Sequence, residues 1–382
     1  MKKVHGIGPL AIPLLCGFAL GSLATLIISF HPALSFTSSP VHNAQQCLSP
    51  LGEPIRQGGV RGTAIPPIVH FVQLKQDQTS QLHFSFEAFL ALYAASLYVQ
   101  PTTIYIHHDF SDDEVANATQ HGSSWTKKVL AAFPALRLSR VTAPTEANGH
   151  AILRVEHRSD FVRLEQLRRH GGVYLDWDVV TLRPLAPLLG AGFQAVVGRQ
   201  FDAFINNGIL LATPQSAVLR IFDREARRVF DGGWITHSVT LLTRVAGALA
   251  AAPGEVLIMD HKAFAPFSWE QESVNQLLGR HVGDPVPELP ANRTVTDRGN
   301  GTVGPDELWE AQTAVKRKEW VYNFSDTIFL HKIFNSVDNP TGYHGVNVPY
   351  ILDRDSNYAL ATWPIVKEGI KQGLIDAQDE TF

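Results

Sequence analysis

Residues 159–187 read SDFVRLEQLRRHGGVYLDWDVVTLRPLAP, and our prediction of the fold starts from this stretch. Ser159 is a good helix N-cap, because its hydroxyl can accept a hydrogen bond from a free backbone N–H of the first turn. Asp160 suits the positive end of the helix dipole, and Arg163, three residues later, projects from the same face. Gly171-Gly172 ends the predicted helix, since glycine tolerates the left-handed conformation found at helix C-termini.

Two aspartates follow the next element, a short strand predicted at Val173–Leu175. Residues i and i+2 of a strand share a face, so we expect Asp176 and Asp178 to point the same way, out of the end of a buried strand. Two buried carboxylates repel each other, and Mg²⁺ or Mn²⁺ commonly binds such a pair together with substrate phosphates. A bare D-x-D pair has a second interpretation, because most such pairs are solvated carboxylates at a strand end or turn.

The residues around the pair favour the cation site. The patterns S-D-x-x-R at 159–163, G-G-x-Y-L-D-x-D at 171–178 and R-P-L at 183–185 together resemble the DXD signature of family 32 glycosyltransferases. This retaining family includes initiating α-1,6-mannosyltransferases, inositol-phosphorylceramide mannosyltransferase subunits and lactosylceramide α-1,4-galactosyltransferases. The resemblance implies a GT-A-like α/β fold, a single Rossmann-type domain with a mostly parallel central sheet. It also implies a nucleotide-sugar donor (UDP- or GDP-hexose) and Mn²⁺ or Mg²⁺.

The resemblance assigns roles to the side chains of this stretch. Asp178 would bind the metal directly, with Asp176 near the ribose, the sugar and the ion. Asp160 and Arg163 would hold sugar hydroxyls and phosphate, and Tyr174 would line the same pocket. The leaving phosphate would take the acceptor proton in a front-face displacement, so the reaction needs no separate nucleophile.

Two other segments resemble family motifs with one departure each. Residues 65–74, IPPIVHFVQL, resemble the opening strand, and the backbone at Val72 and Gln73 would lie near the nucleotide base. Gln73 stands where the family usually has tryptophan, so this position has no aromatic ring to stack on the base. Residues 234–244 resemble W-x-x-x-x-G-P-x-L-L-T-R, with Ser238-Val239 in place of Gly-Pro.

Later segments of the chain supply further candidate site residues, and most of them have a second interpretation. The resemblance places Asp202 and Asn207 in a segment that presents a carboxylate or amide to the transferred sugar, and a covalent route through Asp202 stays open. Asparagine suits sugar hydroxyls because it both donates and accepts, but Asn206-Asn207-Gly208 is equally well explained as a turn. His331 is the candidate late metal ligand. The aromatics of residues 263–270 are either a stacking platform for sugar or part of the core.

Hydrophobic periodicity predicts alternating strands and helices before the aspartate pair and one strand after it. Strands that alternate with helices indicate an α/β layer with a mostly parallel sheet. The aspartate pair would then lie at the carboxyl end of a central strand, where open α/β sheets bind ligands. The predicted strands are 68–72, 103–107, 136–141 and 195–198, and the predicted helices are 84–99 and 125–133.

Composition excludes some classes of protein. With 382 residues and 45% hydrophobic residues, the chain can bury one large core or two modest ones. The formal net charge of −4 gives no reason to propose a nucleic-acid partner. Cys16 and Cys47 are the only cysteines, and both precede the part predicted to be globular, so a disulfide-stapled secreted scaffold is excluded.

The pattern divides the chain into five parts. Residues 1–5 form a short basic tail, and residues 6–30 are apolar or small over about the length of a spanning helix. A cleaved signal peptide is the alternative, but its apolar region is normally shorter. Residues 31–63 are predicted to be a flexible stem, 64–350 the glycosyltransferase domain and 351–382 a C-terminal tail.

These features predict a Golgi membrane protein of the single-pass type II class, since the two N-terminal lysines favour a cytoplasmic N-terminus and a luminal domain. Four N-x-S/T sequons after the proposed anchor agree with a luminal location. They lie at Asn117, Asn292, Asn300 and Asn323.

The functional hypothesis is transfer of a hexose from a nucleotide sugar to a glycan or sphingolipid acceptor. An inactive glycosyltransferase-like scaffold or regulatory subunit is the main alternative, because the Gly-Pro and Trp positions have changed. A metal-dependent phosphohydrolase would need further clustered His and Asp ligands, which the sequence does not show. A lectin would not need the nucleotide-contacting residues.

Overall fold

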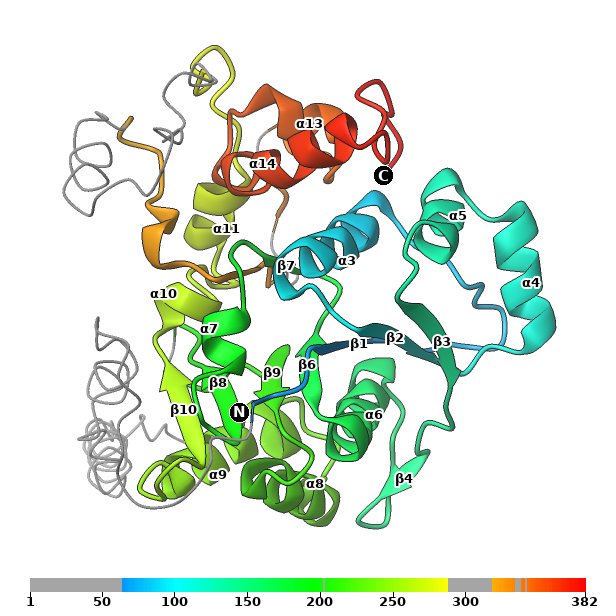
Figure 1. Ribbon diagram of the computed structural model, residues 1–382, viewed down its shortest axis with the longest axis vertical. Coiled ribbons are helices and arrows are strands. Elements are labelled where there is room, and N and C mark those ends of the chain that lie inside the picture. Colours follow the sequence, from blue (N-terminus) through cyan, green and yellow to red (C-terminus); the bar gives the residue numbers. More distant parts are fainter. Residues whose placement is uncertain (1–63, 202, 288–317, 334–337, 341) are drawn as a thin grey trace, which may run out of the picture.

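The computed structural model describes residues 64–201, 203–287, 318–333, 338–340 and 342–382, which form a central sheet with helices on both faces (Figure 1). The predicted cytoplasmic tail, anchor and stem (1–63) and Asp202 lie outside the described residues. Within the described ranges, no helix combines the length and apolar character needed to cross a bilayer.

The central sheet has seven strands in the order β10-β8-β9-β6-β1-β2-β3, with β6 in the middle. Four of its six pairings are parallel, and only β9 runs antiparallel to its two neighbours, β6 and β8. The prediction of an α/β domain with a mostly parallel central sheet, the architecture expected of a GT-A-like fold, is therefore confirmed. The strands are β1 (Ile68–Gln73), β2 (Thr103–His108), β3 (Leu136–Arg140), β6 (Gly172–Leu175), β8 (Ala195–Gly198), β9 (Ile209–Ala212) and β10 (Val256–Met259).

Helices cover both faces of this sheet, so β6, β8 and β9 are buried along their whole length. Two hydrophobic clusters result, one on each face. Figure 1 shows the first group of helices above the sheet and the second below it. The helices above the sheet are α3 (Phe86–Val99), α5 (Ser124–Ala131), α11 (Gln271–Leu278), α13 (Val348–Asp353) and α14 (Asn357–Lys371). The helices below it are α6 (Val155–His170), α8 (Ala217–Val229) and α9 (Leu241–Leu249).

The smaller elements connect these layers. The antiparallel pair β7–β11 lies beyond the carboxyl end of β6, and β4–β5 is a short hairpin before α6. The bounds are α4 (Asp112–His121), α7 (Ala186–Leu189), α10 (His261–Phe264), β4 (Glu146–Ala147), β5 (His150–Ala151), β7 (Val179–Thr181), β11 (Phe329–His331), a π-helical segment (Thr236–Thr240) and a 3₁₀ turn (Phe324–Asp326).

Helix α6 begins five residues earlier than predicted. Arg154 is the N-cap and makes no side-chain cap bond, so Ser159 lies inside the helix rather than at its start. The predicted end is confirmed, because Gly171 and Gly172 have φ angles of 66° and 112°. A Cβ on Gly172 would lie 2.3 Å from the Ile68 carbonyl oxygen, so only glycine allows β6 to begin this close to β1.

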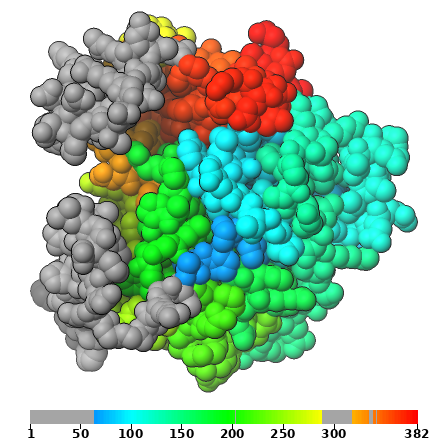
Figure 2. Space-filling model, viewed as in Figure 1, coloured from blue at the N-terminus to red at the C-terminus, as the bar shows by residue number. Residues whose placement is uncertain are grey.

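The predicted tail boundary at residue 350 is wrong, because it falls inside α13. Helix α14 then packs onto the core, where Tyr358, Ile365 and Val366 are at most 1% exposed. The backbone carbonyl of Thr381 also accepts a hydrogen bond from the indole of Trp125 at 3.2 Å. The folded domain therefore continues well past residue 350, and Figure 2 shows the C-terminal residues, in red, against the rest of the domain.

Candidate functional site

The site forms where the central strand β6 ends and two other strands pass beside it. In the antiparallel pairing of β6 with β9, Leu175 lies opposite Ile209, so the residues just before β9 adjoin the aspartate pair. In the pairing of β7 with β11, Val179 lies opposite His331. Strand register thus brings three segments that are far apart in sequence to one edge of the sheet.

The two aspartates share a face through a turn rather than through a continuous strand. The backbone N–H of Asp176 donates to the Gly208 carbonyl at 2.9 Å, and the N–H of Val179 returns to the Asp176 carbonyl at 3.1 Å. Trp177, between them, points away: its ring stacks on Phe71 at 4.4 Å between centroids. The predicted common direction of the carboxylates is therefore correct, although the local geometry is not that of a strand.

Asp176, Asp178 and His331 each offer a ligand atom, and these atoms lie within 4.8 Å of one another. No second group of this kind occurs among the described residues. Burial raises the pKa of the Asp176 carboxyl, although Arg163 opposes this. Burial also acts to raise the pKa of the Asp178 carboxyl, but His331 and Lys332 together leave that pKa below its usual value. Burial acts to lower the pKa of His331, but Asp178 and Asp176 together leave that pKa raised.

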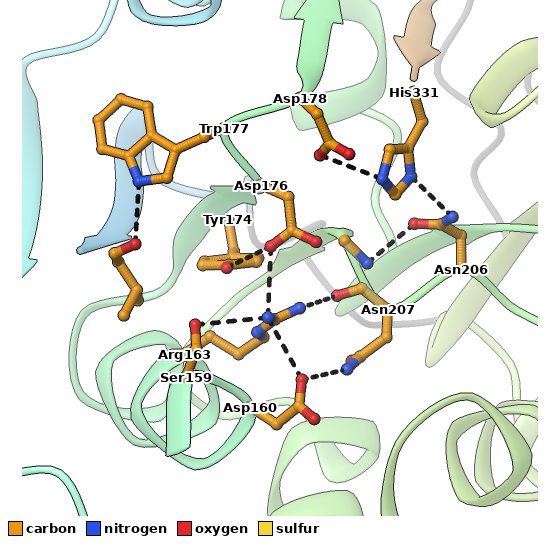
Figure 3. Close-up of polar contacts among 12 residues, drawn as sticks. Ser159, Asp160, Arg163, Tyr174, Asp176, Trp177, Asp178, Asn206, Asn207 and His331 are labelled. Carbon is orange, nitrogen blue, oxygen red and sulfur yellow. Dashed lines mark hydrogen bonds and ion pairs between the residues drawn. The ribbon is translucent and has the colours of Figure 1, made fainter. Parts of the chain in front are cut away.

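Asn206 fixes the proton of the His331 ring (Figure 3). The Asn206 carbonyl oxygen accepts the Gly208 N–H at 2.8 Å, so its amide nitrogen must donate to His331 Nδ1 at 2.9 Å. The neutral ring then carries its proton on Nε2, which faces Asp178 Oδ1 at 3.2 Å. Ligation of a cation through Nε2 would require that proton to move to Nδ1, and the Asn206 amide would have to present its oxygen instead.

Arg163 is the hub on the other side of the aspartate pair (Figure 3). Its side chain is only 6% exposed, and it reaches Asp160 Oδ1 at 3.2 Å and Asp176 Oδ1 at 3.3 Å. Its Nη1 donates to the Asn207 carbonyl at 2.7 Å, and the guanidinium lies 4.3 Å from the centre of the Tyr174 ring. The rigid fork of donors in arginine suits such a multiple contact.

Asp160 and Asp176 each have a further donor. The Tyr174 hydroxyl donates to Asp176 Oδ1 at 2.5 Å. Asp160 accepts from the Asn207 amide at 2.8 Å and lies 3.0 Å from Nε2 of His237. His237 is buried, and no local sequence pattern predicts its contact with this carboxylate.

These residues line a cleft of about 720 Å³, a volume typical of small-molecule sites. Its described lining carries five carboxylates and one guanidinium, a formal charge of −4 with the histidines neutral. Glu87, at the start of α3, belongs to this lining and was missed by sequence analysis. Its ion pair with Lys332, at 2.7 Å, joins segments almost 250 residues apart, which local patterns cannot reveal.

The structure brings most of the predicted site residues together. The cleft is lined by Asp160, Arg163, Tyr174, Asp176, Asp178, Asn207, His331 and Val72. Gln73 does not line it. The Val72 carbonyl accepts the Trp177 indole N–H at 2.9 Å, so the backbone here is tied to the DXD turn. In the aromatic loop, Phe264 and Phe267 belong to the core, as one interpretation expected, whereas Trp269 lines the cleft, and its stacking on a sugar stays a prediction.

The donor set fits a hard divalent cation. The contacts with Tyr174 and Arg163 all fall on Oδ1 of Asp176, and the contact with His331 falls on Oδ1 of Asp178. The described contacts therefore use one oxygen of each carboxylate. Carboxylate oxygens with one imidazole suit Mn²⁺ or Mg²⁺, and the acidic lining favours a cation at this point.

Comparison with known proteins agrees with this geometry. Residues 102–194 match the family model described as a glycosyltransferase sugar-binding region containing a DXD motif. The chain is 26% identical over 284 residues to glucan organizing enzyme 1 of Cryptococcus neoformans var. grubii, covering 68% of this chain and 72% of that protein. It is also 34% identical over 84 residues to an uncharacterized glycosyltransferase of Acanthamoeba polyphaga mimivirus, covering 21% of this chain and 34% of that one.

Among solved structures, the similarity is distant. The glycosyltransferase GlyE of Streptococcus pneumoniae matches with a TM-score of 0.37 and 11% identity, over 83% of this chain and 66% of that chain. The PaToxG glycosyltransferase matches with a TM-score of 0.36 and 13% identity, over 50% of this chain and 71% of that chain.

Proposed function

Because this chain is a glycosyltransferase of the family 32 type, with a DXD-containing sugar-binding region, we propose that it moves a hexose from UDP- or GDP-hexose to a glycan or glycolipid acceptor. We propose further that the transfer depends on Mn²⁺ or Mg²⁺ and retains the anomeric configuration.

The charge of the cleft is the observation that supports metal dependence. Five carboxylates face one guanidinium in the described lining, so a nucleotide diphosphate would enter against a net negative charge. Asp176, Asp178 and His331 would hold the cation, and a bound divalent ion would neutralise charge on the leaving diphosphate as a Lewis acid. Without the cation, the carboxylates of the cleft would repel the diphosphate at short range in a partly buried site.

The remaining side chains orient the donor. Arg163 contacts Asp160, Asp176 and the Asn207 carbonyl, so its guanidinium is held in one orientation within the cleft. Asn207 and Asp160 are bonded to each other and line the cleft, where they can share hydrogen bonds with sugar hydroxyls. Such preorganised polar groups cost little reorganisation during the reaction.

Retention needs no protein nucleophile in this scheme. The bond between the anomeric carbon and the leaving phosphate oxygen breaks, the acceptor oxygen bonds to that carbon on the same face, and its proton passes to the phosphate. The acceptor must therefore approach from the side of the diphosphate. A covalent route through Asp202 is the second possibility, and Asp202 lies outside the described residues.

We also propose that the protein is a Golgi enzyme of the single-pass type II class with a luminal catalytic domain. This rests on the apolar residues 6–30, the preceding lysines and the sequons that follow. Asn117 and Asn323, the two sequons in the described residues, lie in the folded domain, on or beside short helical elements.

The test is nucleotide-sugar hydrolysis and transfer by the full-length protein, with UDP- and GDP-hexoses, with and without Mn²⁺. Asp178→Asn is expected to lower turnover about 100-fold or more, the size of effect seen when one electrostatic contact to a transition state is removed. Asp113→Asn, on the exposed face of α4, is the matched control and should retain wild-type turnover.

Two outcomes would overturn the proposal. If no nucleotide sugar is bound or consumed, the inactive-scaffold alternative takes its place. If Asp178→Asn keeps full turnover and Mn²⁺ dependence, the aspartate pair is not the metal site. The anomeric configuration of the first product, read by proton NMR before mutarotation, decides between retention and inversion.

A further inference from the structure

The cleft continues beyond the aspartate pair to an exposed tryptophan. Trp234 lines the cleft, and 58% of its surface is accessible. Ile235, beside it, also lines the cleft and is 44% exposed. Large apolar side chains exposed at the mouth of a polar cleft are typical of a binding surface.

The backbone that carries Trp234 is fixed on both sides. Before it, Asp231 accepts the N–H of Gly233 at 2.8 Å and the hydroxyl of Thr236 at 3.2 Å, which closes a tight loop. After it, the chain kinks at Ser238, whose φ of −108° and ψ of −106° are far from helical values.

Polar and charged groups also occur near the indole. The Arg154 guanidinium lies 5.4 Å from the centre of its ring, and Glu156 is a further lining residue of the cleft. The His157 ring lies 5.5 Å from the indole, and His157 is 2% exposed. Its Nε2 is buried without a hydrogen-bond partner among the described residues, a costly state unless a ligand or water satisfies it.

A chain of contacts links this surface to the donor side. The His157 and His237 rings meet edge to face at 4.7 Å, and His237 lies 3.0 Å from Asp160. Asp160 in turn pairs with Arg163 at 3.2 Å. A ligand seated on Trp234 would therefore share the cleft with the residues proposed to hold the donor sugar, two side chains away from Asp160.

The cleft also has apolar and aromatic lining residues besides Trp234 and Ile235. Trp269, Phe204 and Ile333 line it, and the Trp269 ring meets Phe201 edge to face at 4.5 Å. The cleft therefore combines the carboxylates of the DXD turn with aromatic and apolar side chains.

We propose that Trp234 is the platform on which a pyranose ring of a glycan acceptor stacks, with Arg154, Glu156 and His157 bonding its hydroxyls. The face of a pyranose is apolar and its rim carries both donors and acceptors, which is the chemistry that this end of the cleft offers. A lipid chain would instead need a continuous apolar surface, and Arg154 and Glu156 interrupt it. This inference rests on the proposed function, and it names the acceptor class.

The first experiment measures sugar binding without a donor, so its result does not depend on catalysis. Saturation-transfer NMR is recorded on the full-length protein with methyl α-mannoside, methyl β-galactoside and methyl β-glucoside. We expect at least one hexoside to bind the wild type and Trp234→Ala to weaken that binding about five- to tenfold, the loss expected for one aromatic contact. Trp234→Phe should recover most of the signal, and Phe382→Ala, an exposed aromatic 53% accessible and outside the cleft lining, should leave it unchanged.

The second experiment measures transfer to the hexoside that binds. Trp234→Ala is expected to raise the acceptor KM about tenfold while the donor KM changes less than about twofold. The proposal is overturned if no hexoside binds, if Trp234→Ala binds sugar like the wild type, or if Phe382→Ala loses binding equally. The proposal is also overturned if Trp234→Ala weakens binding of the protein to phosphatidylcholine vesicles but weakens binding to no hexoside. Failure of the proposed function would appear in donor hydrolysis instead, and would leave the sugar-binding result standing.

Discussion

Replacement of Arg163 by methionine is the sharpest test of the arrangement around the aspartate pair. Methionine keeps much of the side-chain volume and removes the charge and all five donors. The substitution takes one partner from Asp160, one from Asp176 and the only described side-chain donor from the Asn207 carbonyl. It also removes the contact with the Tyr174 ring.

The loss of stability depends on which hydrogen-bond partners Asp160 and Asp176 keep after the substitution. Removing one partner of a buried ion pair generally costs about 3–5 kcal/mol, because a charge remains buried without compensation. Here Asp160 still has Asn207 and His237, and Asp176 still has the Tyr174 hydroxyl. We therefore expect the lower end, a loss of about 3 kcal/mol in the free energy of unfolding.

The same helix supplies a matched control. Arg168 also pairs with a buried carboxylate, Asp223, but its own side chain is 43% exposed, and Arg227 contacts the same carboxylate at 3.1 Å. Exposed pairs contribute little, so Arg168→Met should cost less than about 1 kcal/mol.

The assay is urea unfolding of the full-length protein at neutral pH, followed by fluorescence or circular dichroism. The reasoning is refuted if Arg163→Met unfolds within about 1 kcal/mol of the wild type, or if Arg168→Met is equally destabilised. The first result would mean that water, rather than Arg163, compensates the carboxylates, and the second would mean that the burial of the arginine does not set the cost of its removal.

Two further predictions concern the centre of the site and the sheet beneath it. Gly208→Ala would place a methyl group 2.6 Å from Oδ2 of Asp176, so we expect nucleotide-sugar hydrolysis to fall at least about tenfold, whereas Gly247→Ala, in open space on α9, should keep wild-type turnover. Equal turnover by the two variants would show that the carboxylate is not needed in its present position. Acid should also destabilise the fold, because burial lowers the pKa of His70 to about 4 and that of His107 to about 2. Both rings are neutral in the folded protein and bond each other at 2.9 Å, so the stability they contribute is complete above about pH 6.5 and is lost as the pH falls toward 4. His70 alone implies a loss of about 2 kcal/mol between pH 7 and pH 5, and a urea midpoint that does not move over this interval would contradict the assignment.

Local sequence was sufficient for the elements that carry the DXD motif. The helical spacing that places Asp160 and Arg163 on one face, the glycine pair and the apolar run of β6 each act over a few residues, so their outcome does not depend on distant chain. The start of α6 was missed, because Arg154 caps it without a side-chain bond and no pattern marks that position. The boundary at residue 350 was missed because α13 and α14 are stabilised by burial against the core, which is a tertiary effect.

The sequence by itself determined that two carboxylates leave the end of a buried central strand beside an arginine, because hydrophobic periodicity and glycine stereochemistry are local properties. Only the tertiary structure decided which groups complete the site. The register of β9 against β6 brings Asn207 to Arg163, and the pairing of β11 with β7 brings His331 to Asp178. Register depends on long-range pairing and on which face of each strand is buried, so a single sequence does not reveal it.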